Sequence, residues 1–117
     1  MSVVNVKVDF IRKEGYANLQ KWMEDTQNVY IGRAGIVFID KVRFPKSSSN
    51  FCNPFKVGKD GTREEVIQKY ETYIRGRLDK DVELVKELRE MKGKRLGCWC
   101  KPEGCHGDVL IKLLKEY

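Results

Sequence analysis

The sequence has no long apolar run, one histidine, three prolines and four cysteines among 117 residues. No stretch approaches the roughly 20 consecutive apolar residues of a membrane-spanning helix, so we expect no membrane partner. No basic-then-apolar leader opens the chain, which favours a cytoplasmic protein. In that compartment we expect the cysteines to be reduced thiols and not a disulfide framework.

Charged residues make up 34% of the chain and hydrophobic residues 41%, which is ordinary for a globular protein. This length and composition predict a single α/β domain over residues 1–117. The formal net charge of +6 favours a polyanionic partner such as a nucleotide or a nucleic acid. A merely basic, soluble protein stays the alternative, because acidic residues are mixed throughout and no long basic block stands out.

The first part of the chain is predicted to form a strand, a helix and two more strands, over residues 4–10, 17–25, 28–32 and 36–44. The first strand is indicated by Val4, Val6, Val8 and Phe10, which alternate with polar residues. The last two strands can pair as a hairpin around Gly35.

The second part begins with a long segment, residues 45–61, that has no helical period. Thr62 and Glu65 then form a capping box for one helix, and Asp81 can cap a second. A strand over residues 94–99 and a helix over residues 108–117 complete the chain. This order predicts a small, Rossmann-like α/β layered fold with a largely parallel sheet flanked by helices.

The stretch from Gly97 to Asp108 holds three of the four cysteines and the only histidine. It lies between the last predicted strand and the last predicted helix. In open α/β sheets, ligands bind beyond the carboxyl end of a strand, where the next helix begins. Cys105 and His106 fall at that junction, so we expect the site there.

Three kinds of chemistry are open at this junction, and the first is a zinc site. Cys98, Cys100, Cys105 and His106 would supply four ligands. The spacing is not that of two separated ligand pairs, and neighbouring side chains at a helix start rarely reach one ion together. We therefore expect no metal, with Cys98 and Cys100 as packing groups.

The second possibility is a reactive thiolate at Cys105, whose pKa a helix N-terminus can lower. The third is an anion-binding turn, in which the amides of residues 104–108 point at a ligand. In that case His106 can move protons near neutral pH, and Asp108 can bond a sugar hydroxyl or activate a water. The alternative to all three is a purely structural role, in which the small thiols fill the core and the histidine caps a turn.

Other polar residues can complete a ligand site. Arg33 follows a predicted strand end, as arginines that clamp phosphate do. Asn53 can present its amide from the long segment. The sequence Gly58-Lys59-Asp60-Gly61-Thr62 leads into a helix but lacks the P-loop spacing. We count Gly58, Lys59, Asp60 and Thr62 as candidate ligand-binding residues, with helix capping as the alternative for Asp60 and Thr62.

Four stretches resemble an uncharacterised family of bacteria, phages and large DNA viruses. They are Val29-Tyr30-Ile31-Gly32-Arg33, Asn53-Pro54-Phe55, Gly58-Lys59-Asp60-Gly61-Thr62 with the helix start after it, and Gly97-Cys98-Trp99-Cys100 through Cys105-His106-Gly107-Asp108. Between the first two of these stretches the chain carries a segment, Ile36 to Cys52, that is longer than in shorter members of that family. Its ending is also similar to a second uncharacterised family with a Rossmann-like fold. If the protein is viral, the compartment is the host cytoplasm.

The sequence thus supports a first hypothesis: a cytoplasmic enzyme that acts on a nucleotide, a nucleoside or a nucleic-acid base. Arg33, Asn53 and the 58–62 loop would hold phosphate or sugar, His106 and Asp108 would perform acid–base work, and Cys105 would be a nucleophile. The alternatives are a non-catalytic module that binds nucleic acid or protein, and a zinc-stabilised structural domain. The sequence names no reaction, cofactor or oligomeric state, and whether the protein is an enzyme stays open.

Overall fold

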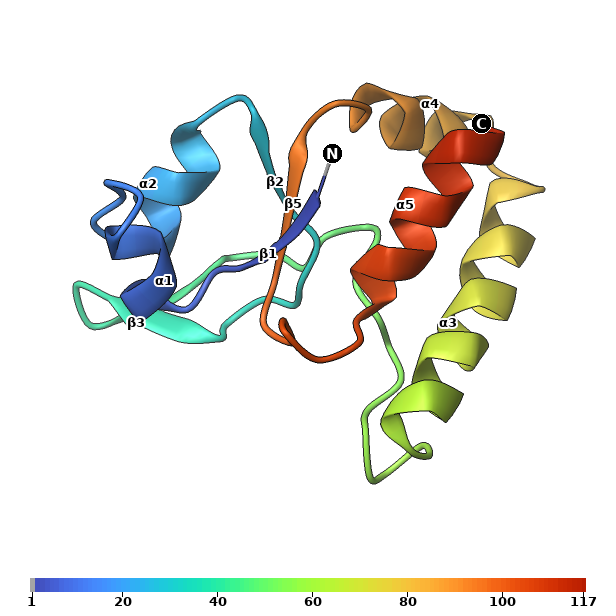
Figure 1. Cartoon of the computed structure of the whole chain (residues 1–117), viewed down its shortest axis with the longest axis horizontal. Coiled ribbons are helices and arrows are strands. Elements are labelled where there is room, and N and C mark those ends of the chain that lie inside the picture. Colours follow the sequence, from blue (N-terminus) through green and yellow to red (C-terminus); the bar gives the residue numbers. More distant parts are fainter. Residues whose placement is uncertain (1) are drawn as a thin grey trace.

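Three parallel strands form the centre of the fold, and the last strand of the chain lies between the first two (Figure 1). The computed structural model describes residues 2–117. The strands are β1 (Ser2–Asn5), β2 (Asn28–Tyr30) and β5 (Arg95–Cys98), in the order β1-β5-β2. Both neighbours pair with β5 in parallel. The predicted α/β fold with a largely parallel sheet is confirmed.

Helices cover both sides of this sheet (Figure 1). Two short helices, α1 (Val8–Arg12) and α2 (Leu19–Glu24), pack on one side around the buried Trp22. Three helices lie on the other side: α3 (Arg63–Leu78), α4 (Val82–Glu90) and α5 (His106–Glu116). The larger apolar core lies under these three helices, and it is the core that borders the candidate site.

The central strand β5 contacts the apolar cores on both faces of the sheet. Leu96 and Cys98 point into the larger core and are almost fully buried. Gly97, between them, faces the other side, where a Cβ atom would run into Trp22 and Val6. Side chains alternate between the faces of a strand, so this Leu-Gly-Cys order directs a thiol toward α3 and α5.

The first predicted strand is too long. The sheet strand ends at Asn5, and α1 begins at Val8. The cause is local: the Asn5 side-chain oxygen accepts a hydrogen bond from the Lys7 amide at 2.9 Å, which turns the chain. Val8 and Phe10 therefore sit on a short helix and are partly exposed, at 39% and 48%.

The predicted hairpin around Gly35 is also wrong. Strand β2 pairs with β5, and residues 36–44 instead fold back on themselves as β3 (Val37–Ile39) and β4 (Val42–Phe44). The turn between these strands uses Asp40 and Lys41 with φ of 51° and 67°. Neither residue is a glycine, so the sequence carried little sign of this turn.

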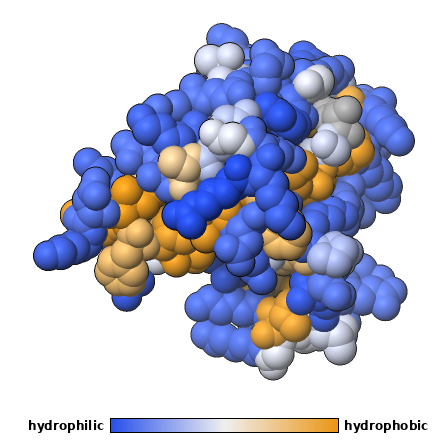
Figure 2. Space-filling view, turned by 60° about the vertical axis from the view of Figure 1, so that its left-hand side comes forward, coloured by the Kyte–Doolittle hydropathy of each residue, from blue (hydrophilic) through white to orange (hydrophobic). Residues whose placement is uncertain are grey.

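Apolar side chains are exposed on the side of the molecule where α1 and the β3–β4 hairpin lie (Figure 2).

The predicted helix caps are confirmed. Thr62 and Glu65 form the capping box of α3, and Asp81 accepts a hydrogen bond from the Leu84 amide at the start of α4. Residues 45–61 contain no helix or strand, as expected. Among the described residues, no helix combines the length and the apolar character that spanning a membrane requires.

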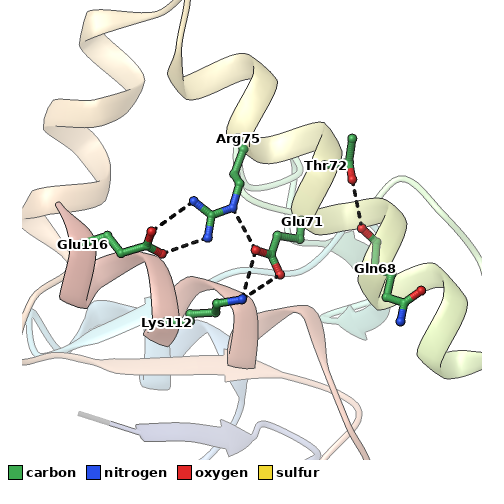
Figure 3. A network of polar contacts seen from close by, with 6 residues as sticks. All are labelled: Gln68, Glu71, Thr72, Arg75, Lys112 and Glu116. Carbon is green, nitrogen blue, oxygen red and sulfur yellow. Dashed lines mark hydrogen bonds and ion pairs between the residues drawn. The ribbon is translucent and has the colours of Figure 1, made fainter.

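Helices α3 and α5 are joined by an ion network on their outer surface (Figure 3). Arg75 lies between Glu71 and Glu116, at 2.8 Å from each carboxylate. Lys112 pairs with Glu71 at 3.1 Å. This network holds the two helices side by side, and their N-termini form two walls of the candidate site.

Candidate functional site

A cavity of about 450 Å³ opens where β2 and β5 end and α3 and α5 begin. Its lining includes three basic side chains (Arg33, Lys56 and Arg63), two aromatic rings (Phe55 and Trp99), three thiols (Cys98, Cys100 and Cys105) and His106. None of the described lining residues is Asp or Glu. The cavity therefore lies at the predicted junction, at the carboxyl end of the strands.

Arg33 and Asn53 lie close together at the rim of the cavity, and their side chains form hydrogen bonds with backbone groups of the protein. The Arg33 guanidinium donates to the carbonyls of Asn53 and Phe55, at 2.6–3.1 Å, through two of its three nitrogens. The Asn53 side-chain oxygen accepts from the Phe55 amide at 2.9 Å, and its nitrogen donates to Val66. Both residues thus fix the long segment against the end of β2.

The Gly58–Thr62 loop lies outside the cavity lining and builds the start of α3. The Gly58 amide donates to the Gly61 carbonyl at 2.7 Å, and Asp60 accepts from the Lys56 amide at 2.8 Å. Thr62 is the N-cap of α3. The residues next to this loop that line the cavity are Lys56, Val57 and Arg63.

The three thiols form one cluster. The Sγ atoms of Cys98, Cys100 and Cys105 all lie within 4.8 Å of one another. Cys98 and Cys105 are buried at 1% exposure, whereas Cys100 is half-buried at the cavity wall. Cys105 is also the N-cap of α5, and the Gly107 amide donates to its sulfur at 3.3 Å. Cys98 and Cys100, which we expected to be packing groups, do pack in and against the larger core, and they also line the cavity.

The thiols differ in how easily they lose a proton. Hydrogen bonds from Cys105 and Cys98 lower the pKa of Cys100, and the nearby Arg63 guanidinium lowers it further. Sharing hydrogen bonds with Cys100 raises the pKa of Cys105, and burial adds to the rise. Cys100 is thus the thiol that ionises first, and Cys105, the predicted nucleophile, retains its proton.

His106 is buried beneath the thiols. Its Nε2 lies 2.7 Å from the Ile31 carbonyl, so this nitrogen carries the proton and donates it. Nδ1 then has a free lone pair and lies 3.7 Å from the Cys105 sulfur. The Tyr70 ring packs edge-on at 5.0 Å between centroids. Burial lowers the pKa of His106, which keeps the imidazole neutral at neutral pH.

Asp108 does not line the cavity. One carboxylate oxygen accepts from the Cys105 amide at 3.1 Å, which completes the capping box of α5. The other pairs with Lys101 at 2.7 Å. The carboxylate that we expected to do acid–base work is placed to hold the cysteine loop on the helix.

A family comparison covers most of the chain. Residues 16–116 match the family described as Domain of unknown function (DUF4326). The chain belongs to this family. The expected kinship with an uncharacterised family of phages and large DNA viruses is thereby confirmed.

This DUF4326 chain is similar in sequence to two uncharacterised viral proteins. One is a 12.4 kDa protein of Enterobacteria phage T4, named for the nrdA-td intergenic region. It is 42% identical over 62 residues, which cover 51% of this chain and 56% of that protein. The other, from Acanthamoeba polyphaga mimivirus, is 34% identical over 96 residues, covering 75% of this chain and 67% of that protein. No solved structure matches the chain.

Sequence reasoning missed Arg63 and Trp99 as site residues. Arg63 donates to the Gly104 carbonyl at 3.2 Å and lies beside Cys100. A signal was present, because a cation in the first turn of a helix opposes the helix dipole and needs a local reason. Trp99 is held by Tyr30, whose hydroxyl accepts from the indole nitrogen at 2.8 Å. No pattern in the sequence links these two rings.

Proposed function

We propose that the chain is an enzyme that acts on a nucleotide, a nucleoside or a nucleic-acid base bound in the cavity. One observation carries the proposal: basic and aromatic side chains surround a single cavity of about 450 Å³, with no described carboxylate in its lining. Volumes of this size are typical of small-molecule sites. Arg63 and Lys56 suit a phosphate, and Phe55 and Trp99 offer faces on which a base can stack.

The reacting end of such a ligand is expected to lie against the thiols and His106. Apart from Lys56, these are the groups of the cavity that can exchange a proton or bind an electrophile. An ionised Cys100 at this place serves either as a nucleophile or as a metal ligand. Because Nε2 of His106 donates to the Ile31 carbonyl, the group of this side chain that can accept a proton is the Nδ1 lone pair, which faces Cys105. A thiol-rich site of this kind fits the reducing cytoplasm that we expect for this protein.

Binding is tested by calorimetric titration with a matched series of base, nucleoside and 5′-nucleotide. Arg63→Ala should weaken nucleotide binding by about 10-fold to 100-fold, because it removes a charge-assisted contact of about 1.5–3 kcal/mol. Binding of the uncharged nucleoside should change little. Arg89→Ala removes the same charge from an exposed position outside the cavity and is the control.

Turnover is tested by chromatography of the same ligands after incubation with the protein. His106→Gln is the preferred variant, because glutamine can still donate to the Ile31 carbonyl and leaves a smaller void than alanine. Loss of product with nucleotide affinity retained supports an enzyme. Binding without product from the unaltered protein would instead support a non-catalytic module, and absence of binding to the whole series would refute the proposal.

A further inference from the structure

The thiol cluster has a feature that nucleotide binding does not explain: three sulfurs converge on one point. They come from two elements, Cys98 at the end of β5 with Cys100 just after it, and Cys105 at the N-cap of α5. Their Sγ atoms lie within 4.8 Å of one another. Three thiolates around one zinc ion, at about 2.3 Å from the metal, are separated by about 3.8 Å. The three sulfurs thus converge within a range that includes this spacing, although the Cys98 and Cys105 sulfurs, at 2.7 Å, lie closer together than zinc requires.

The loop that carries the sulfurs is fixed from several sides. The Glu103 amide donates to the Cys100 carbonyl at 2.8 Å, and Asn5 donates from β1 to the Lys101 carbonyl. Asp108 accepts from the Cys105 amide at 3.1 Å. Preorganised ligands of this kind are what a metal site requires, because little backbone has to be ordered when the ion binds.

The surroundings also compensate negative charge on sulfur. The Gly107 amide donates to the Cys105 sulfur, and the Arg63 guanidinium lies beside Cys100. Such outer partners stabilise thiolates and orient them toward a metal. No described carboxylate lines the cavity and competes with this charge.

His106 does not join the three sulfurs. Its Nε2 is committed to the Ile31 carbonyl, and its Nδ1 approaches Cys105 alone, at 3.7 Å. All three cysteines line the cavity, so the fourth side of the cluster is open to it. Zinc sites with three protein ligands and one open position are the catalytic kind, in which a water or a substrate completes the tetrahedron.

We propose that Cys98, Cys100 and Cys105 bind one zinc ion whose fourth coordination position opens into the cavity. A ligand set made of thiolates alone favours zinc among the divalent metals. As the ion enters, the sulfurs of Cys98 and Cys105 move apart by about 1 Å from their present 2.7 Å. The ion site does not require that the cavity ligand be a nucleotide.

The test is native mass spectrometry of the full chain, purified without chelator and saturated with zinc, beside the denatured chain. We expect a mass excess of one zinc ion. Cys100→Ser should lose it, and this half-buried position is the least disruptive of the three. Cys52→Ser should keep it, because Cys52 lies outside the cluster and serves as the matched control. Circular dichroism checks that each variant is folded.

Cobalt(II) then reports the ligand set and the open position. The cobalt-loaded chain should show a thiolate charge-transfer band and intense tetrahedral d–d bands, and added azide should shift the d–d bands. His106→Gln should leave the charge-transfer band in place. A metal-free native mass with no cobalt bands, or a Cys98–Cys105 disulfide in the protein as isolated under reducing conditions, overturns the proposal. Bands indifferent to azide, or lost in His106→Gln, overturn the open three-thiolate site.

The two proposals fail separately. A zinc adduct in a protein that binds no base, nucleoside or nucleotide leaves the ion site standing and removes the proposed function. A metal-free protein that binds nucleotide through Arg63 does the opposite.

Discussion

At the scale of single residues, two glycines set how closely the elements around the site approach one another. Gly97 lets Trp22 pack against β5, and Gly107 lets the first turn of α5 pack against β1. A Cβ at Gly107 would lie 2.9 Å from both Val3 methyls and 3.0 Å from the Ile31 Cδ1. Close approach here brings Cys105 and His106 to the strand ends.

Gly107→Ala is therefore expected to lower the free energy of unfolding by about 1–3 kcal/mol, the usual cost of overpacking. Gly76→Ala is the matched comparison within α3, because a Cβ there meets no atom within 4 Å. That change should raise stability by about 0.5–1 kcal/mol, since alanine favours a helix. Urea denaturation measures both. Equal effects of the two substitutions would contradict the packing argument.

His106 should make stability depend on pH. Burial lowers its pKa in the folded chain, so the unfolded chain binds the proton more readily. The neutral form then stabilises the fold above the unfolded pKa of about 6.5, and this contribution is lost as the pH falls below that value. We expect the urea midpoint to decrease between about pH 7.5 and about pH 5.5.

Cys100 should also make the folded chain less stable as the pH falls, because its pKa too is lowered in the folded chain. The comparison is therefore with His106→Gln, in which only the histidine contribution is missing. The decrease between the two pH values should be smaller in that variant. Parallel pH profiles of the two proteins would show that His106 does not titrate on unfolding.

At the scale of elements, the ion network between α3 and α5 holds two walls of the cavity together. Glu71→Gln removes the carboxylate that pairs with Lys112 and one of the two that pair with Arg75, which keeps Glu116. Because these groups are partly exposed, we expect a loss of less than about 1 kcal/mol in the free energy of unfolding. High salt should reduce the loss further.

The control for this prediction is Glu90→Gln in α4, because Glu90 forms no ion pair with any residue that the structure describes. Urea denaturation at low and high salt compares the two variants. A loss at Glu71 that is independent of salt would mean that its effect is packing and not charge.

The elements also show what the sequence could predict. Helices with strong local signals were found, since the Thr62 capping box and the Asp81 cap need only neighbouring residues. The early end of β1 was missed because one side-chain hydrogen bond from the Lys7 amide to Asn5 decides it. The partner of β2 was missed because it lies in β5, far along the chain, and tertiary pairing overrides a local hairpin.

The position of the cavity could be predicted from the sequence, but the arrangement of the side chains that line it could not. Cys105 and His106 could be assigned to the junction of a strand and a helix from the order of elements alone. That Cys98 and Cys100 share a cluster with Cys105 depends on the path of the intervening loop, which no periodicity encodes. The same holds for Asp108, whose two oxygens are taken by the Cys105 amide and Lys101.

At the scale of the whole molecule, the central strand should be the most protected part. Both edges of β5 are paired, and Leu96 is fully buried. Amide hydrogen exchange should therefore be slower in β5 than in the edge strands β1 and β2. Residue-resolved exchange by NMR measures this order. Faster exchange in β5 than in β1 would contradict the observed strand order.

The position of β5 has a consequence for how the protein is made. Of the five helices that residues 2–117 form, four precede β5 in the sequence, and so do both edge strands. While these elements are being synthesised, β1 and β2 lack the strand that lies between them in the folded protein. Their backbone N–H and C=O groups can pair only after Arg95–Cys98 has left the ribosome. The sheet can form only after β5 has been made, and the cysteine cluster only after Cys105, so the nascent chain carries unpaired strand edges until then.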